Sequence, residues 1–189
     1  MISETINGIQ LTFETDDSSF SPLHVDKGTL AMLSSISFSP SDKVLDLGCG
    51  YGVVGIFAAK LIGEQHVVMS DVDEKSVALS KKNAERNGVG GVKTVLSDGF
   101  HTMQDRDFTL ILSNPPYHVD FSVPKHFIEK GFSRLKIGGK MYMVTKRRDW
   151  YKHKLIAIFG GVKIDEIDGY FVFCAEKRSA QYANAKRKK

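Results

Sequence analysis

A short apolar segment that ends in alternating glycines constrains the fold of this chain more than any other feature. Residues 44–47 read Val-Leu-Asp-Leu, and residues 48–52 read Gly-Cys-Gly-Tyr-Gly. Glycines let the backbone turn sharply and approach a ligand closely. The apolar stretch that follows, to about Ile62, is typical of a buried helix. The sequence therefore predicts a buried strand, a ligand-binding loop and a helix, in that order.

Strands and helices alternate along the rest of the chain. Further strands are predicted at 67–69, 92–96, 108–112, 141–144, 163–167 and 170–175, and helices at 29–36, 74–87, 121–135 and 150–159. Gly138-Gly139 is expected to turn the third of these helices into the next strand, and Asp168-Gly169 is a tight-hairpin signal. This order predicts a Rossmann-like α/β fold. Its seven-stranded, mostly parallel sheet has helices on both faces and one antiparallel edge strand from the C-terminal hairpin.

The chain of 189 residues has the length of one domain. We expect a domain over 1–176, with a short N-terminal extension over 1–25 that includes an edge strand at 8–14, and a basic tail over 177–189. Two cysteines fit a reducing compartment. No apolar run has the length of a membrane span, and the N-terminus has no signal-peptide pattern. We therefore expect a cytoplasmic protein that does not enter membranes.

Charge is distributed unevenly along the sequence. The net charge is +4, but residues 1–124 carry 9 Lys/Arg against 16 Asp/Glu, whereas residues 125–189 carry 17 against 6. A basic half of this kind favours a polyanionic partner, although a solubilising surface is an equal alternative on composition alone.

The glycine loop points to an adenosine ligand. Gly50-x-Gly52-x-x-Gly55 matches the dinucleotide fingerprint, with Asp71 at about the expected 20 residues further on. That pattern alone also fits a nicotinamide cofactor, or glycines that only pack a helix on a sheet. Asp46 decides between them, because a carboxylate before the glycines would repel a pyrophosphate and suit an ammonium group. This combination favours S-adenosylmethionine.

Acidic residues after the next two strands fit the adenosine part of such a ligand. Asp71 is placed to accept both ribose hydroxyl protons, while Asp73 better fits a helix cap. Asp98 is placed to accept from the adenine amino group, with Phe100 or Val72 against the ring, although taken singly Asp98 equally fits a turn residue. The cofactor-binding residues predicted from these strand ends are Asp46, Gly48, Gly50, Gly52, Asp71, Val72, Asp98, Gly99 and Asn114.

A proline-rich motif follows the fourth strand of the sheet. It reads Asn114-Pro115-Pro116-Tyr117, and these four residues are the predicted catalytic group. Two prolines stiffen the backbone, so that the Asn114 side-chain oxygen and a motif carbonyl are fixed as acceptors. Two such acceptors suit a planar –NH2 group whose lone pair faces a methyl donor. Tyr117 offers a flat face for a base or amide.

These motifs together resemble the class I S-adenosylmethionine-dependent methyltransferases, and more narrowly the small-domain group that includes ribosomal RNA guanine-N2 methyltransferases. The matching segments are 11–15, 20–21, 25–29, 46–52, Asp71, 114–117 and 169–170. The resemblance implies that Asp26, Gly28 and Thr29 border the methionine end of the cofactor. Larger relatives carry a second, inactive copy of the domain, which 189 residues cannot hold, so we expect substrate selection to come from elsewhere or from a partner copy.

A basic stretch with aromatics follows the fifth strand. Residues 146–154 include Arg147, Arg148 and Trp150, which with Tyr117 are the predicted substrate-binding residues. Cations beside aromatics suit RNA phosphates and unpaired bases, although Trp150 equally fits a core anchor of the next helix. The six histidines show no metal-ligand spacing, so we expect no metal.

The combined prediction is an N-methyltransferase that uses S-adenosylmethionine and acts on an exocyclic amino group in RNA. The resemblance favours guanine N2 of 16S ribosomal RNA. Adenine N6 in tRNA and the N5 of a protein glutamine remain open, because the same motif serves all three. Two different classes also remain: an NAD-dependent oxidoreductase and a nonenzymatic RNA-binding module. The sequence leaves open whether the protein is a monomer or a homodimer.

Overall fold

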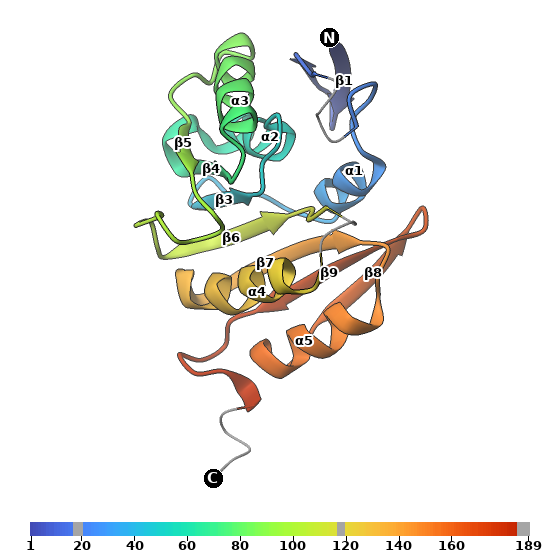
Figure 1. Ribbon diagram of the computed structural model, residues 1–189, viewed down its shortest axis with the longest axis vertical. Coiled ribbons are helices and arrows are strands. Elements are labelled where there is room, and N and C mark those ends of the chain that lie inside the picture. Colours follow the sequence, from blue (N-terminus) through green and yellow to red (C-terminus); the bar gives the residue numbers. More distant parts are fainter. Residues whose placement is uncertain (17–20, 117–119, 185–189) are drawn as a thin grey trace.

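A twisted sheet of seven strands lies between two layers of helices in the computed structural model, which describes residues 1–16, 21–116 and 120–184 (Figure 1). Its strands are β3 (Val44–Leu47), β4 (Val67–Asp71), β5 (Lys93–Leu96), β6 (Phe108–Ser113), β7 (Leu135–Thr145), β8 (Lys163–Ile167) and β9 (Tyr170–Glu176). Their order across the sheet is β5-β4-β3-β6-β7-β9-β8. The predicted fold class is confirmed.

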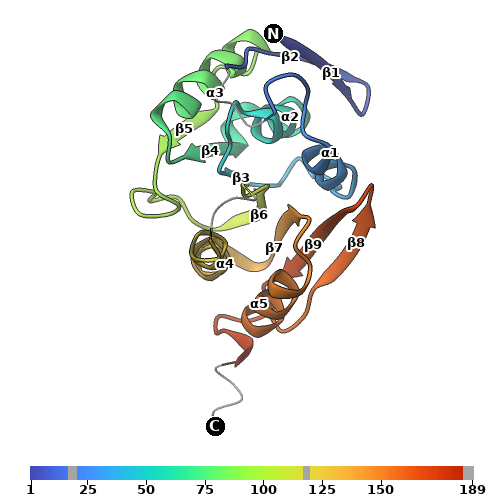
Figure 2. The same cartoon turned by 45° about the vertical axis from the view of Figure 1, so that its right-hand side comes forward.

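Helices cover both faces of this sheet (Figure 2). They are α1 (Lys27–Ser34), α2 (Val53–Ile62), α3 (Glu74–Arg86), α4 (Ser122–Arg134) and α5 (Asp149–Phe159), with a short 3₁₀ turn η1 (Glu64–His66). Two apolar cores result. One joins α1, α2 and α3 to the sheet and contains Phe57, and the other joins α4 and α5 to the opposite face and contains Phe173.

The C-terminal hairpin forms where the sequence predicts it. Asp168 and Gly169 connect β8 and β9 and have φ of 50° and 77°, which is the backbone of a two-residue hairpin turn. Within the hairpin, β9 is the antiparallel strand and lies between β7 and β8, so that β8 forms the sheet edge.

Two local predictions differ from the structure. The predicted edge strand at 8–14 is β2 (Ile9–Phe13), but it pairs with an unforeseen strand β1 (Ile2–Ile6) in a separate hairpin and not with the main sheet. The side chain of Asn87, the C-cap of α3, binds the backbone N–H and carbonyl of Thr12, and this holds the hairpin on the helix layer. Strand β1 thus supplies the pairing that the main sheet was expected to give.

The second difference concerns Gly138-Gly139, which does not turn a helix into a strand. Strand β7 already begins at Leu135, and the glycines lie inside it, where its pairing with β6 shifts register. The backbone of Lys177 fills the irregularity, since Gly138 N–H donates to its carbonyl (2.8 Å) and its own N–H donates to Gly139 O (2.9 Å). Glycine allows this shift because Gly138 has φ of +85°.

The first residues of the basic tail pack against the domain. The Lys177 side chain is buried, and its Nζ donates to Leu135 O. The Tyr182 hydroxyl donates to Glu129 O (3.0 Å), and its ring meets Phe132 edge-on. Over the described part of the chain, no helix combines the length and the apolar character needed to cross a membrane.

Parallel pairing places the functional loops together. Strands β3, β4, β5 and β6 run in the same direction, so their carboxyl ends meet at one edge of the sheet. The glycine loop, the two acidic loops and the proline motif all start from that edge, which is where open α/β sheets bind ligands.

Candidate functional site

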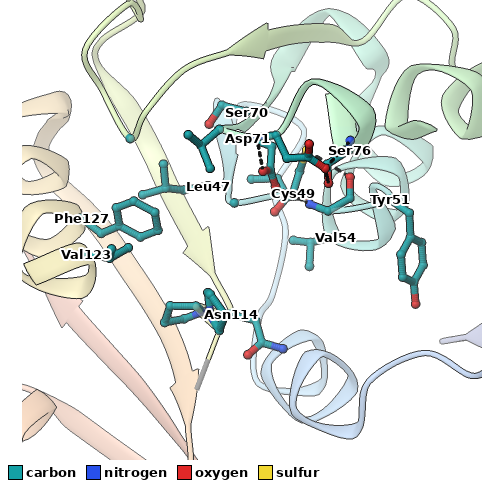
Figure 3. Close-up of a pocket in the computed structure, with 18 of the residues that line it drawn as sticks. Leu47, Cys49, Tyr51, Val54, Ser70, Asp71, Ser76, Asn114, Val123 and Phe127 are labelled. Carbon is teal, nitrogen blue, oxygen red and sulfur yellow. Dashed lines mark hydrogen bonds between the residues drawn. The ribbon is translucent and has the colours of Figure 1, made fainter. Parts of the chain in front are cut away.

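A cavity of about 400 Å³ opens at the carboxyl ends of β3 to β6, between α1, α2 and α4 (Figure 3). Most of the residues predicted for catalysis or cofactor binding line it. They are Asp26, Thr29, Asp46, Gly48, Gly50, Asp71, Val72, Asp98, Gly99, Asn114, Pro115 and Pro116. Residues that are far apart in the sequence thus meet in one place. Tyr117 lies outside the described residues.

Backbone hydrogen bonds hold the glycine loop against β4. The N–H groups of Gly48 and Cys49 both donate to Ser70 O, at 2.9 Å each. Gly50 N–H donates to the Asp71 carboxylate, also at 2.9 Å. Gly48, Gly50 and Gly52 have positive φ, between 52° and 97°, a conformation that disfavours any side chain. The loop is therefore fixed before any ligand arrives.

Asp46 is a buried carboxylate in β3, two residues before this loop. Its Oδ2 accepts from Gly55 N–H (2.8 Å), and the residue is only 3% exposed. Burial, and to a smaller extent the negative charge of Asp71, raise the pKa of Asp46 to about 7, against the lowering effect of the Gly55 N–H. The site can thus hold a cation at Asp46, because a cation stabilises the ionised carboxylate.

Gly55 makes this arrangement possible through close packing. A Cβ at Gly55 would lie 2.4 Å from Met69 Cγ and 3.2 Å from Asp46 Oδ2. The third glycine of the predicted fingerprint therefore brings α2 onto the sheet and brings its own N–H to the carboxylate. This supporting role was not assigned from the sequence.

Asp71 and Asp73 have different hydrogen-bond partners, and Asp73 is the helix cap that its position predicts. Asp71 bridges two loops, since Oδ2 accepts from Gly50 N–H and Oδ1 from Asp73 N–H (3.0 Å). Asp73 caps α3 and accepts from the N–H groups of Lys75 and Ser76. A carboxylate oxygen has more than one lone pair, so Asp71 keeps capacity to accept from a ligand in the cavity.

Asn114 is held by its amide nitrogen. Its Nδ2 donates to Asp26 Oδ1 (2.8 Å) and to Thr29 Oγ1 (2.9 Å), and Asp26 Oδ1 also accepts Thr29 N–H as the N-cap of α1. These bonds determine which end of the amide faces away from α1. The Asn114 Oδ1 atom is buried and has no hydrogen-bond partner among the described residues. Asn114, which lines the cavity, therefore holds a fixed, buried acceptor without a partner among the described residues.

The proline motif extends a strand that is itself anchored. Ser113 Oγ donates to Leu47 O (2.8 Å) and ties the end of β6 to β3. Pro115 is buried and Pro116 is exposed, and both line the cavity. The cavity wall at this point thus offers carbonyl oxygens but no proline N–H.

Two predicted cofactor residues, Gly28 and Gly52, are not among the residues that line the cavity. A Cβ at Gly28 would lie 2.7 Å from the Tyr170 ring, so this glycine lets the start of α1 pack on β9. Gly52 is the N-cap of α2, and a Cβ there would approach Ile56 and Ser80. In this structure both glycines allow the close packing that positions Asp26 and the glycine loop.

The predicted substrate residues form a separate exposed surface after β7. The Trp150 ring stacks on Phe121 with centroids 4.4 Å apart, and the Arg147 guanidinium lies over Phe121 at 5.1 Å. Arg148 lies over Phe171 at 6.0 Å. Trp150 also packs against the core between α4 and α5, so it combines an anchoring contact with a surface position. Phe121 was not singled out from the sequence.

Several cavity residues carry no signal of their own in the sequence. Val123 and Phe127 come from one face of α4 at helical spacing, which indicates burial and not ligand contact. Ser70 is a single serine before Asp71. Only the fold shows that these side chains reach the same cavity.

The remaining candidates give no catalytic group or metal centre. Cys49 is buried, and burial, together with the charges of Asp46 and Asp71, raises the pKa of its thiol. A thiolate nucleophile is therefore disfavoured. Among the described residues, His, Cys, Asp and Glu side chains do not gather into a group that could hold a metal ion.

Known proteins are similar to this chain in both sequence and fold. The methyltransferase small domain family matches residues 10–174. YbxB of Bacillus subtilis is 33% identical over 172 residues, which are 88% of this chain and 86% of YbxB. The chain belongs to the methyltransferase small domain family. It is accordingly a methyltransferase.

Larger relatives of this family contain the same domain within a longer chain. Ribosomal RNA small subunit methyltransferase C of Pseudoalteromonas atlantica is 31% identical over 84% of this chain and 47% of its own length. The structure of Thermus thermophilus 16S rRNA N2 G1207 methyltransferase, in complex with AdoMet and guanosine, superposes with a TM-score of 0.84 at 30% identity. That match covers 94% of this chain and 50% of the other. The chain thus spans about half the length of these two relatives.

Proposed function

We propose that this methyltransferase uses S-adenosylmethionine to methylate an exocyclic amino group in RNA, with guanine N2 of small-subunit ribosomal RNA as the target. The observation that carries the proposal is the buried Asn114 Oδ1, a fixed acceptor without a partner among the described residues, in a cavity at the ends of the central strands. Two relatives support this substrate, since one is named a small-subunit ribosomal RNA methyltransferase and the other a 16S rRNA N2 G1207 methyltransferase.

The residues of the cavity fit S-adenosylmethionine in both charge and shape. The Asp46 carboxylate, which is buried beside the helix start, suits the ligand's ammonium group. Asp71, Val72 and Asp98 line another part of the cavity and suit ribose and adenine. When bound, S-adenosylmethionine supplies an electrophilic methyl group on a sulfonium.

Asn114 orients the accepting amine. Its Oδ1 and a backbone carbonyl of the proline motif accept the two N–H protons of an –NH2 group, and this aims the nitrogen lone pair away from the wall. An aromatic amine is a weak nucleophile because its lone pair is delocalised into the ring. Hydrogen bonds to both protons favour a pyramidal nitrogen and raise its reactivity.

Positioning supplies most of the rate in this proposal. Because Asp26 and Thr29 lock the Asn114 amide, the acceptor needs no rearrangement when the substrate enters. Effective molarities of ~10⁵–10⁸ M are accessible to groups held in this way. The excess proton leaves after methyl transfer, so the site needs no strong base.

RNA is favoured over protein by the surface beside the cavity. Val123, two residues after Phe121, lines the cavity, so the Arg147–Phe121–Trp150 stack lies near its rim. Exposed cations on aromatic rings bind phosphates and unpaired bases. A base in a helix must leave its stack to enter the cavity, which costs a few kcal/mol and less in single-stranded RNA.

The deciding experiment uses labelled S-adenosylmethionine with undermodified 16S rRNA, tRNA and total protein, followed by mass spectrometry of nucleosides and of modified glutamine. We expect N2-methylguanosine in 16S rRNA with the wild-type protein and none with Asn114→Ala. Detection of N6-methyladenosine or methylglutamine would show that the substrate is adenine or a protein glutamine and not guanine. Thermal stabilisation by NAD, with none by S-adenosylhomocysteine, would overturn the assignment of S-adenosylmethionine as the methyl donor.

A further inference from the structure

Two buried side-chain polar atoms lack a hydrogen-bond partner among the described residues, and both belong to residues that line the same cavity. One is Asn114 Oδ1, and the other is Ser70 Oγ. Figure 3 shows Ser70 beside Asp71, well separated from Asn114 across the cavity. The two atoms therefore belong to separate parts of the cavity wall.

Ser70 is held in place by its backbone. It is the second-last residue of β4, and its carbonyl accepts the N–H groups of Gly48 and Cys49. The residue is 1% exposed and pairs in register with Leu47 of β3. Its side chain, like that of Leu47, lies on the α4 face of the sheet, because neighbouring positions of parallel strands share a face.

A hydroxyl group is costly at this position in the free protein. Leu47 and Phe127, which line this part of the cavity, belong to an apolar core. A buried polar group without a hydrogen bond destabilises a protein by about 1–3 kcal/mol. Alanine would fill the position without that cost. The hydroxyl is therefore explained if a ligand completes its hydrogen bond.

We propose that Ser70 Oγ hydrogen-bonds the adenosine part of the cofactor and helps the site to recognise it. Ser70 is adjacent to Asp71 and Val72, which are assigned to that part, and it is remote from Asn114. A hydroxyl both donates and accepts, so it suits the ring nitrogens or ribose oxygens of adenosine. This inference rests on the proposed use of S-adenosylmethionine.

The test compares Ser70→Ala with wild type by calorimetry and by thermal melting without ligand. The two probes are S-adenosylhomocysteine and 5′-methylthioadenosine, which lacks the amino-acid end. Loss of one hydrogen bond should weaken both probes by about 3- to 10-fold. The melting temperature of the free protein should stay the same or rise, because the orphan hydroxyl is gone.

Ser97→Ala is the matched control. Ser97 is also a buried serine of the cavity, but its Oγ accepts Thr102 N–H (3.3 Å). Its removal leaves a protein donor unpaired, so the melting temperature of the free protein should fall. Ser70→Ala should therefore leave the melting temperature unchanged or raise it, whereas Ser97→Ala should lower it.

Unchanged affinity of Ser70→Ala for both probes would overturn the inference, and so would a drop in the melting temperature like that of Ser97→Ala. Weakening of S-adenosylhomocysteine alone would also overturn it, since the contact would then not be to adenosine. If the wild-type protein binds neither probe, the proposed use of S-adenosylmethionine is itself wrong, which distinguishes this outcome from a failure of the Ser70 contact alone.

Discussion

Two neighbouring regions of the molecule use polar groups in opposite ways. At the ends of β3 to β6, Asp46 is buried and Asn114 is half-buried, and backbone or side-chain partners fix both groups. After β7, three consecutive cations are exposed and lie on aromatic rings: Lys146 on Tyr170, Arg147 on Phe121 and Arg148 on Phe171. Both regions lie at the same sheet edge, because β7 runs parallel to β6.

This difference assigns methyl transfer to the buried site and selection of the RNA to the exposed basic surface. Groups held in a buried, low-dielectric site act strongly and depend on geometry. Exposed cations act weakly one at a time, sum over several contacts and are screened by salt. Substitutions in the buried site should therefore produce large, specific losses, whereas substitutions on the basic surface should produce graded losses that depend on salt.

Asn114→Ala should give the largest effect. It removes one preorganised acceptor, and loss of a single such group lowers kcat by roughly 10²–10³-fold. The dissociation constant for S-adenosylhomocysteine should stay near the wild-type value, because Oδ1 is assigned to the amine. Single-turnover methylation and calorimetry measure the two quantities. Full activity of this variant would refute the role of Asn114.

Asp71→Ala should come next, with Asp73→Ala as its control two residues away. A hydrogen bond to a charged group contributes about 1.5–3 kcal/mol, so cofactor affinity should fall by roughly 10- to 100-fold. Asp73→Ala removes the cap of α3 and should lower the melting temperature while the dissociation constant stays nearly unchanged. Equal losses of affinity in both variants would show that loop stability, and not a ribose contact, is being measured.

Asp46→Asn should change how binding responds to pH. Because the pKa of Asp46 is about 7, the wild-type site gains its negative charge as the pH rises through that value. The wild-type affinity for S-adenosylhomocysteine should therefore fall by up to about tenfold per pH unit below pH 7. The Asp46→Asn variant has no carboxylate to ionise and should lose this dependence. Calorimetric titrations of both proteins at several pH values measure the difference, and parallel pH profiles would contradict the role of Asp46.

The same substitution should act on stability with the opposite sign. The folded-state pKa of Asp46 lies above its unfolded value of about 3.8, so its contribution to stability is complete at acid pH and is lost as the pH rises through about 7. Asp46→Asn should therefore melt higher than the wild type at pH 8, by roughly 2–4 °C per kcal/mol, and similarly to it at pH 4. A melting temperature of Asp46→Asn below that of the wild type at pH 8 would contradict a destabilising buried charge at Asp46.

The buried site was largely predictable from the sequence, for a physical reason. Parallel strands bring their carboxyl ends together, so Asp46, Asp71, Asp98 and Asn114 could be placed at one edge from chain order alone. The sequence could not show which side chains would remain without partners. Ser70 is an example, since the sequence does not show that its Oγ is buried without a hydrogen-bond partner among the described residues.

The basic surface was predictable in composition but not in arrangement. Arg147, Arg148 and Trp150 stand out as a cluster of cations with an aromatic, but their partners come from elsewhere in the chain. Phe121 precedes α4, and Phe171 belongs to β9. Likewise, Gly138-Gly139 signals a turn locally, whereas the distant Lys177 backbone makes it a register shift within a strand.

Arg147→Ala should weaken RNA binding moderately and reduce its salt dependence. Removing one phosphate contact lowers the slope of log affinity against log salt by about 1. Lys136→Ala is the control, because Lys136 is also exposed and basic but lies at the opposite, amino end of β7. Fluorescence anisotropy with a single-stranded RNA at several salt concentrations measures both. Equal slopes for the two variants would show that net charge, and not this surface, governs binding.

Truncation of the tail should give the smallest effect, and its position matters. Removal of 185–189 takes away four basic residues and no acidic one, so it should flatten the salt dependence of RNA binding and leave the melting temperature unchanged. Removal of 179–189 also deletes Tyr182, which contacts Glu129 and Phe132 of α4, so it should lower the melting temperature as well. If both truncations keep the wild-type salt slope, the tail does not contact RNA, and selection belongs to the surface after β7 alone.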